Sequence, residues 1–187
     1  MKLYALCDQA TLTKNNISLD TFVAKALKHK AEVIQYRNKD ASIETSKKSL
    51  LHLRKIWDGF LIINDHVDLV PFCDGVHLGQ EDLLRFGHDA KSAVKAIREV
   101  IHSDKLLGIS THNKKEILEA NKLDLNYIGL GAYRATDTKD VPNILGEKLD
   151  RLAQLSAHPV GAIGGIKLND SFDHVTYLVV GSDLYEH

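Results

Sequence analysis

Short apolar runs alternate with longer amphipathic stretches along the chain. The short runs have the length and composition of buried strands, and the longer stretches repeat apolar residues at the helical period. Eight runs are predicted as strands: Leu3–Leu6, Val33–Tyr36, Phe60–Ile63, Gly75–Leu78, Leu106–Ile109, Tyr127–Leu130, Val160–Ile163 and Tyr177–Val180. Helical patterns lie near Leu19–Lys28, Ile43–Trp57, Ala90–Ile101, Lys115–Ala120 and Gly146–Leu155.

Strands that alternate with helical crossovers predict a parallel α/β sheet, either open or closed. Eight such units favour closure into a (β/α)₈ TIM barrel, although 187 residues is short for a fold that usually has about 200 to 250. The crossover Lys167–His174 is too short for a packed helix, and almost nothing follows the eighth strand. We therefore predict a barrel shortened in its C-terminal helices. A second subunit could cover the flank left open there, which makes a homo-oligomer one expectation.

Composition places the chain among ordinary soluble globular proteins. Hydrophobic residues make up 44% and charged residues 26%, and the formal net charge is −1. This balance gives no support for nucleic-acid or membrane partners, so any anion site must be built locally. The chain shows no apolar run of signal-peptide or membrane-spanning type. Cys7 and Cys73 lack metal-ligand spacing and are interpreted as reduced thiols, as expected of a cytoplasmic protein.

Polar and glycine-rich clusters follow the predicted strands and do not precede them. The clusters are Gln35–Asp40, Asn64–Asp65, His77–Asp82, Ser110–His112, Gly129–Lys139, Gly164–Gly165 and Gly181–Ser182. In a barrel all of these strand ends meet on one face, which is where the active sites of such barrels lie. The clustering therefore predicts a functional site at the C-terminal face.

Asp65 and Asp82 follow adjacent strands and could together bind a hard divalent cation. Magnesium is usually held by one or two carboxylates together with substrate phosphates and water. Taken alone, the pair is better explained by Asp65 capping the next helix and Asp82 being solvated, because Asp is a preferred N-cap.

Basic and hydroxyl side chains follow two other strands. Arg37 and Lys39 lie two residues apart and would project to the same face, where both suit a phosphate group. A solvated basic turn explains them equally simply. Thr136, Thr138 and Lys139 offer two hydroxyls and an ammonium group in a loop, which suits phosphate oxygens but also a plain surface loop.

Two further features after the later strands suggest ligand contacts. Gly164 and Gly165 would let backbone N–H groups approach an anion, in the place where barrels often bind phosphate. Ser110 and His112 could do acid–base or oxyanion work, although a lone histidine at a helix entry is more often structural. The ten histidines show no Ser-His-Asp or metal-ligand spacing.

Taken in order, these motifs resemble the thiamine-phosphate synthase family and its relative, the thiazole tautomerase. The matching strings are QYRNKD (35–40), LIINDHVDLV (61–70), DGVHLGQEDL (74–83), GISTHN (108–113), YIGLGAYRATDTK (127–139) and PVGAIGGI (159–166). They span most of the chain, so the resemblance implies a single barrel domain over residues 1–187.

The resemblance implies a magnesium-dependent transferase that joins hydroxymethylpyrimidine diphosphate to thiazole phosphate and releases pyrophosphate, in thiamine biosynthesis. Asp65 and Asp82 would hold the metal ion. The implied diphosphate ligands are Gln35, Arg37, Lys39, Asn64 and Lys139. Ser110 would contact the pyrimidine and the leaving group, and Ser110, Lys39 and Lys139 would be catalytic. The implied thiazole-phosphate site comprises Thr136, Thr138 and Gly165, with backbone near Val180 and Gly181.

The chain departs from the family pattern in the thiazole-phosphate half. A proline and an aromatic-proline pair usual in the family are replaced across Gly131–Thr136, where Arg134 adds a cation that could alter the loop or strengthen anion binding. Gly181 stands where a serine is usual. Two alternatives stay open: a thiazole tautomerase, which typically lacks the aspartate pair and uses a histidine near His112, and a non-catalytic phosphate-ligand binder with a regulatory role.

Overall fold

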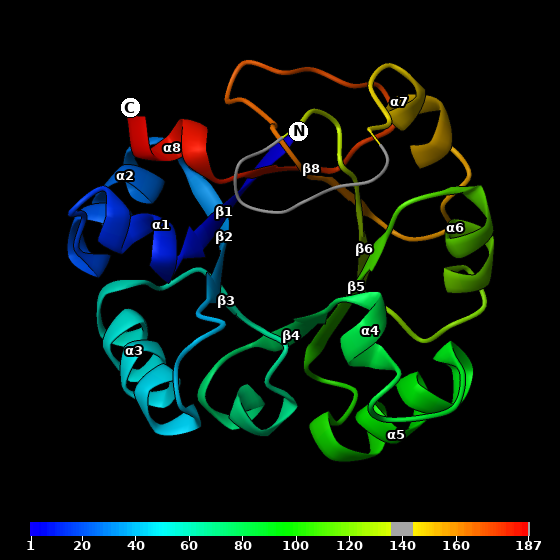
Figure 1. The fold of residues 1–187 in the computed structure, drawn as a ribbon, viewed down its shortest axis with the longest axis horizontal. Helices are drawn as coiled ribbons and strands as arrows, with labels where there is room; N and C mark the ends of the chain where they lie inside the picture. The colour runs from blue at the N-terminus through cyan, green and yellow to red at the C-terminus, as the bar shows by residue number, and fades with distance from the viewer. Residues whose placement is uncertain (136–143, 187) are drawn as a thin grey trace.

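Eight parallel strands close into a barrel in chain order (Figure 1). The computed structural model describes residues 1–135 and 144–186. The strands are β1 (Lys2–Asp8), β2 (Ala31–Arg37), β3 (Phe60–Asn64), β4 (Gly75–Leu78), β5 (Leu106–Thr111), β6 (Tyr127–Leu130), β7 (Val160–Ala162) and β8 (Tyr177–Val180). The predicted TIM barrel is confirmed, and β4, β6 and β8 begin and end at the predicted residues.

Helices surround the ring of strands. They are α1 (Gln9–Lys14), α2 (Leu19–Lys28), α3 (Ile43–Ile56), the 3₁₀ helix η1 (Val67–Phe72), α4 (Gln80–Leu83), α5 (Ala90–Ile101), α6 (Lys114–Ala120), α7 (Lys148–Ala153) and α8 (Ser182–Glu186). The longer ones begin at capping side chains, such as Ser18 before α2 and Asp89 before α5. The helix predicted from Gly146 starts two residues later, because Gly146 has a positive φ of 49°.

The crossover between β7 and β8 is short and has no packed helix, as predicted. Residues 163–176, all of them described, form no helix between β7 and β8. The chain crosses there as an irregular loop, drawn in orange in Figure 1. Helix α8 packs its buried Leu184 and Tyr185 near the N-terminal units of the barrel.

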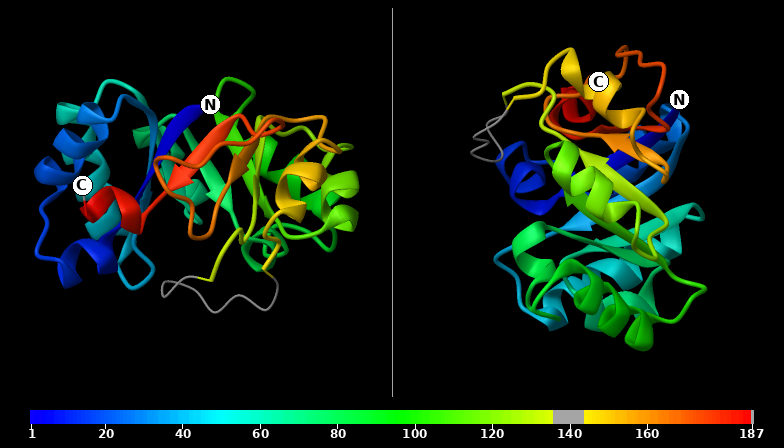
Figure 2. Two further views of the ribbon diagram at one scale, coloured as in Figure 1. Left: turned by 90° about the horizontal axis from the view of Figure 1, so that it is seen from above. Right: turned by 90° about the vertical axis from the view of Figure 1, so that its right-hand side faces the viewer.

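Side chains of alternate strand residues form two separate cores. Tyr4, Val33, Ile62, Tyr127 and Val179 fill the inside of the barrel. The intervening strand residues join the helices in a larger outer core. Because every strand runs in the same direction, all carboxyl ends lie on one side of the barrel, as the side view in Figure 2 shows.

The structure bears on two further expectations from the sequence, the absence of a membrane-spanning segment and the reduced state of the two cysteines. Among the residues that the structure describes, no helix has the length and apolar character needed to cross a membrane. Cys7 and Cys73 are both free and buried, in agreement with reduced thiols.

Candidate active site

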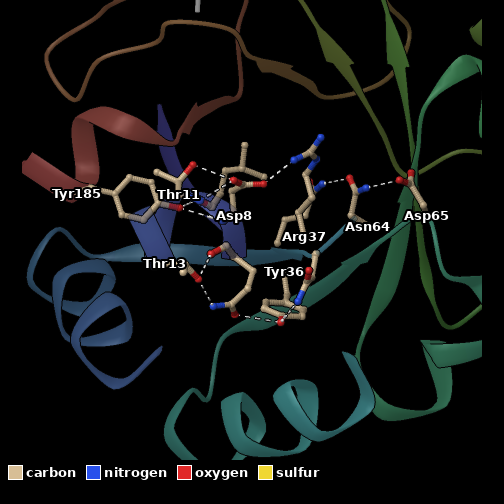
Figure 3. Close-up of polar contacts among 12 residues, drawn as sticks. Asp8, Thr11, Thr13, Tyr36, Arg37, Asn64, Asp65 and Tyr185 are labelled. Atoms are coloured by element: carbon tan, nitrogen blue, oxygen red, sulfur yellow. Dashed lines mark hydrogen bonds and ion pairs between the residues drawn. The ribbon is translucent and has the colours of Figure 1, made fainter. Parts of the chain in front are cut away.

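Asp65 occupies a constrained position directly after β3. Its backbone has a φ of 65°, in the left-handed region that Asp and Asn tolerate better than most residues. Its N–H donates to the carbonyl of His77 at 2.9 Å, and its Oδ2 accepts from Asn64 Nδ2 at 2.5 Å (Figure 3). The capping explanation is wrong for Asp65, because η1 follows His66 and has no side-chain cap.

The carboxyl groups of Asp65 and Asp82 face each other. Burial raises the pKa of Asp65, and so do the nearby charge of Asp82 and a hydrogen bond with it, while Lys39 and Arg37 lower it. Asp82 lies in α4 with its side chain 33% exposed, so it is half-buried and not fully solvated. The structure therefore brings the two predicted metal ligands together, within reach of two predicted basic residues.

The donor set at this corner fits magnesium. Two carboxylates that converge in a partly buried place favour a hard cation, which would offset the mutual repulsion that raises the pKa of Asp65. Within residues 1–135 and 144–186, no group of three or more His, Cys, Asp or Glu side chains could hold a metal ion. Magnesium would thus need oxygen ligands from water and substrate phosphate in addition to this pair.

Arg37 is held in place by Asp8, a residue that the sequence patterns did not single out. Its Nη1 lies 2.5 Å from Asp8 Oδ1, and the arginine side chain is only 19% exposed (Figure 3). The other oxygen of Asp8 caps α1 by accepting from the backbone and the hydroxyl of Thr11 at 3.0 and 2.7 Å. A solvated basic turn is therefore wrong for Arg37, whereas Lys39 is exposed.

Two amide side chains continue the site inward from Asp65. Gln35 Nε2 donates to Asn64 Oδ1 at 2.7 Å, and Gln35 Oε1 accepts from the hydroxyl of Tyr4 at 2.8 Å. Gln35 is buried, with 4% of its surface exposed. Both amides thus have fixed orientations, which is what a specific polar contact with a ligand requires.

Ser110 lies across the barrel mouth, at the end of β5. Its Oγ is 3.0 Å from His77 Nε2, and its carbonyl accepts from Gln80 Nε2 at 2.5 Å. His112, by contrast, is bonded to Glu116, which accepts from the His112 backbone N–H at 2.8 Å and lies 2.9 Å from its Nδ1. The structural interpretation of His112 is therefore supported.

The glycine pair after β7 has the conformation that only glycine adopts readily. Gly164 and Gly165 have φ of 87° and 65°. A Cβ at Gly164 would lie 2.4 Å from the Cβ of Ala132, and one at Gly165 would lie 2.7 Å from that of Arg134. At these two glycines the backbone therefore packs directly against the segment after β6, with no room for a side chain between them.

Arg134 is fully engaged within the protein. It donates to both oxygens of Asp170 at 2.6 and 2.8 Å and to the carbonyl of Gly165 at 2.7 Å, and its guanidinium group lies 4.3 Å from the ring centroid of Tyr133. The expectation that Arg134 strengthens anion binding is not supported, because its charge is neutralised by Asp170. It fixes the loop instead.

The remaining predicted residues fall into two groups. Thr136, Thr138 and Lys139 lie outside the described residues. Val180 is fully buried in the outer core, so only its backbone can face a ligand, and Gly181 follows it at the end of β8.

Some residues near the site were given no role from the sequence. Tyr4, Asp8 and Tyr127 belong to no predicted cluster, and His77 and Gln80 belong to the predicted cluster His77–Asp82 without an assigned role. Three of these residues, Tyr4, His77 and Tyr127, carry a polar group in a strand that is otherwise mostly apolar. This exception to the apolar strand pattern could have indicated from the sequence that they have a role inside the barrel. Asp8 and Gln80 border helices too short to be seen as periodic patterns.

Comparisons with known proteins agree with this arrangement. A family model described as thiamine monophosphate synthase matches residues 3–176. The thiamine-phosphate synthase of Persephonella marina is 33% identical, over 89% of this chain and 77% of that protein. Those of Lawsonia intracellularis (36%; 88% and 74%) and Dictyoglomus thermophilum (31%; 98% and 85%) are similarly related.

Solved structures support the same barrel. The thiamine phosphate pyrophosphorylase of Pyrococcus furiosus superposes with a TM-score of 0.75 at 24% identity, over 99% of this chain and 90% of that one. The (S)-3-O-geranylgeranylglyceryl phosphate synthase of Thermoplasma acidophilum has a TM-score of 0.67 at 14% identity, over 100% and 87%. These two likenesses concern the fold alone. From the family model and the curated relatives, the chain belongs to the thiamine monophosphate synthase family.

Proposed function

We propose that this chain is a thiamine-phosphate synthase that couples hydroxymethylpyrimidine diphosphate to thiazole phosphate and releases pyrophosphate. The observation that carries the proposal is the convergence of Asp65 and Asp82 beside Arg37 and Lys39 at the carboxyl ends of the strands. Two carboxylates next to two cations match a diphosphate that arrives with a divalent metal ion. Family membership supports the same activity.

The reaction breaks one bond and forms another at the same carbon. The bond between the pyrimidine methylene and the diphosphate oxygen breaks, and its electron pair leaves with pyrophosphate. The thiazole ring nitrogen then gives its lone pair to that methylene carbon and forms the new C–N bond. Negative charge grows on the leaving group in this step, so Arg37 and Lys39 would lower the barrier by electrostatic stabilisation.

Magnesium, held by Asp65 and Asp82, would supply further positive charge to the diphosphate oxygens. The protein itself has to bind the pyrimidine and exclude water from its reactive carbon. Gln35 and Asn64 have fixed amide groups for binding, and Ser110 faces them across the barrel mouth. We assign Lys139, Thr136, Thr138 and Gly165 to the pyrophosphate and thiazole-phosphate contacts from their positions in the sequence.

The proposed setting is the cytoplasm, which suits two free thiols and phosphorylated small-molecule substrates. The flank between β7 and β8, where the described chain has no helix, is a place that a second copy could cover.

The experiment is a pyrophosphate-release assay with both substrates and magnesium. The expected result is turnover that falls about 100-fold in Asp65→Asn and in Asp82→Asn. Asp68→Asn is the matched control, since Asp68 is an exposed carboxylate on η1, and it should keep full activity. Binding of both substrates without turnover would favour the non-catalytic binder. Thiazole isomerisation without coupling, sensitive to substitution of His112, would favour the tautomerase.

A further inference from the structure

A continuous chain of side-chain hydrogen bonds crosses the inside of the barrel and joins two halves of the candidate site. In order, its members are Ser110, His77, Tyr127, Tyr4, Gln35, Asn64 and Asp65. The successive donor–acceptor distances are 3.0, 3.1, 2.9, 2.8, 2.7 and 2.5 Å. The four central residues are at most 7% exposed. Little water reaches them, so each hydrogen bond constrains the next one strongly.

The direction of the hydrogen bonds is determined at the Asp65 end. Asn64 Nδ2 lies 2.5 Å from Asp65 Oδ2 and donates to it, so the amide nitrogen of Asn64 faces Asp65. The amide oxygen of Asn64 is then left to accept from Gln35 Nε2. Gln35 in turn accepts through Oε1, to which the Tyr4 hydroxyl donates at 2.8 Å.

The same reasoning continues from Tyr4 to Ser110. A phenol has one hydrogen, and Tyr4 uses its hydrogen on Gln35, so Tyr127 must donate to Tyr4. Burial raises the pKa of both tyrosines, so each keeps its hydrogen at neutral pH. Tyr127 therefore accepts from His77 Nδ1. In a neutral imidazole that carries its proton on Nδ1, Nε2 accepts, and the hydroxyl of Ser110 donates to it.

Packing keeps the histidine ring in this orientation. The rings of His77 and Tyr127 are stacked, with centroids 5.5 Å apart and an interplanar angle of 28°. Gly129 leaves the room that the ring needs, since a Cβ there would lie 3.2 Å from the Cε1 of His77. The ring therefore has little freedom to turn over and exchange its two nitrogens.

We propose that Tyr4, Tyr127 and His77 are positioning residues that make Ser110 a hydrogen-bond acceptor toward the substrate. This inference rests on the proposed function. The Ser110 hydrogen is used on His77, so only oxygen lone pairs face the barrel mouth, and they suit an N–H donor on the bound pyrimidine. Ser110 would not donate to the leaving pyrophosphate, which narrows the role expected from the sequence. The same series of hydrogen bonds holds Gln35 and Asn64 in their binding orientation.

The proton position on His77 can be measured without any activity. In protein labelled with ¹⁵N-histidine, the His77 signals are identified by their loss in His77→Gln. The expected spectrum has a protonated Nδ1 and an unprotonated Nε2. Tyr127→Phe removes the acceptor of Nδ1, so the form with the proton on Nε2 should grow. A proton on Nε2 in the unsubstituted protein, or a spectrum unchanged in Tyr127→Phe, would overturn the proposal.

A double-mutant cycle tests the effect on Ser110. Tyr127→Phe should lower kcat about tenfold when Ser110 is present, and about twofold or less in Ser110→Ala, because the two residues act through one chain. Tyr177→Phe is the control: it removes a hydroxyl from a tyrosine beside Tyr4 that is not a member of the chain, and kcat should not change. Equal losses in both backgrounds would contradict the positioning role. If the unsubstituted protein releases no pyrophosphate, the proposed function is wrong. The ¹⁵N-histidine spectrum would still test the proposed direction of the hydrogen bonds from Ser110 to Asp65.

Discussion

Arg134 and Asp170 form a two-point ion pair that joins the segment after β6 to the loop after β7. The guanidinium group donates to both carboxylate oxygens, and one of its nitrogens also reaches the carbonyl of Gly165. The backbone N–H of Arg134 donates to the carbonyl of Gly164 at 2.8 Å. The arginine that departs from the family pattern thus stabilises the glycine pair to which a phosphate role is assigned.

Arg134→Lys should destabilise the protein by about 1 kcal/mol. Lysine keeps the charge but cannot make the planar two-point contact, and the pair is partly exposed, so the loss is modest. The free energy of unfolding in urea measures it. Arg151→Lys, at an exposed position on α7, should change nothing. An equal effect of both substitutions would show that the two-point geometry is unimportant.

The Arg134–Asp170 pair also predicts a pH dependence of stability. Hydrogen bonds from Arg134 hold the pKa of Asp170 below its usual range. A carboxylate with a lowered folded-state pKa stabilises the protein above its unfolded pKa, near 4, and this contribution is lost as the pH falls through the folded value. The stability difference between the unsubstituted protein and Asp170→Asn should therefore be constant from pH 6 to 8 and shrink below about pH 4. Urea unfolding of both proteins across this range checks it. A difference that grows on acidification would contradict the ion-pair explanation.

Gly165→Ala should destabilise the protein by about 1 to 3 kcal/mol, because a positive φ and a close Cβ contact act together. The new methyl group would meet the Cβ of Arg134 at 2.7 Å. Thermal unfolding compares it with Gly181→Ala, whose Cβ would find its nearest neighbour at 3.7 Å and whose φ is not positive. A stable Gly165→Ala protein would mean that this loop rearranges easily.

The strands were predictable because each is a short apolar run bounded by polar residues. Helices α1 and α4, with six and four residues, are too short to show a helical period, and with them the environment of Asp8 and Gln80 was missed. The parallel topology predicted that Asp65 and Asp82 follow adjacent strands on one face, but the residues alone favoured a cap and a solvated carboxylate, and their pairing was implied by the family resemblance. The direction of the hydrogen bonds through Tyr4, Tyr127 and His77 did not, because it depends on side chains from three strands that are far apart in the sequence.

The two carboxylate oxygens of Asp8 bind different partners, so a substitution can separate their effects. One accepts from Thr11 as the N-cap of α1, and the other binds Arg37. Asp8→Asn should keep the cap, because Asn is an equally good N-cap, and lose the ion pair. We expect the KM for the pyrimidine diphosphate to rise about tenfold with little loss of thermal stability, because Arg37 is no longer held in its binding position. Thr11→Val, which removes only the hydroxyl contact with Asp8, should leave KM unchanged. A lower KM in Asp8→Asn would mean that Asp8 competes with the diphosphate for Arg37 and does not position it.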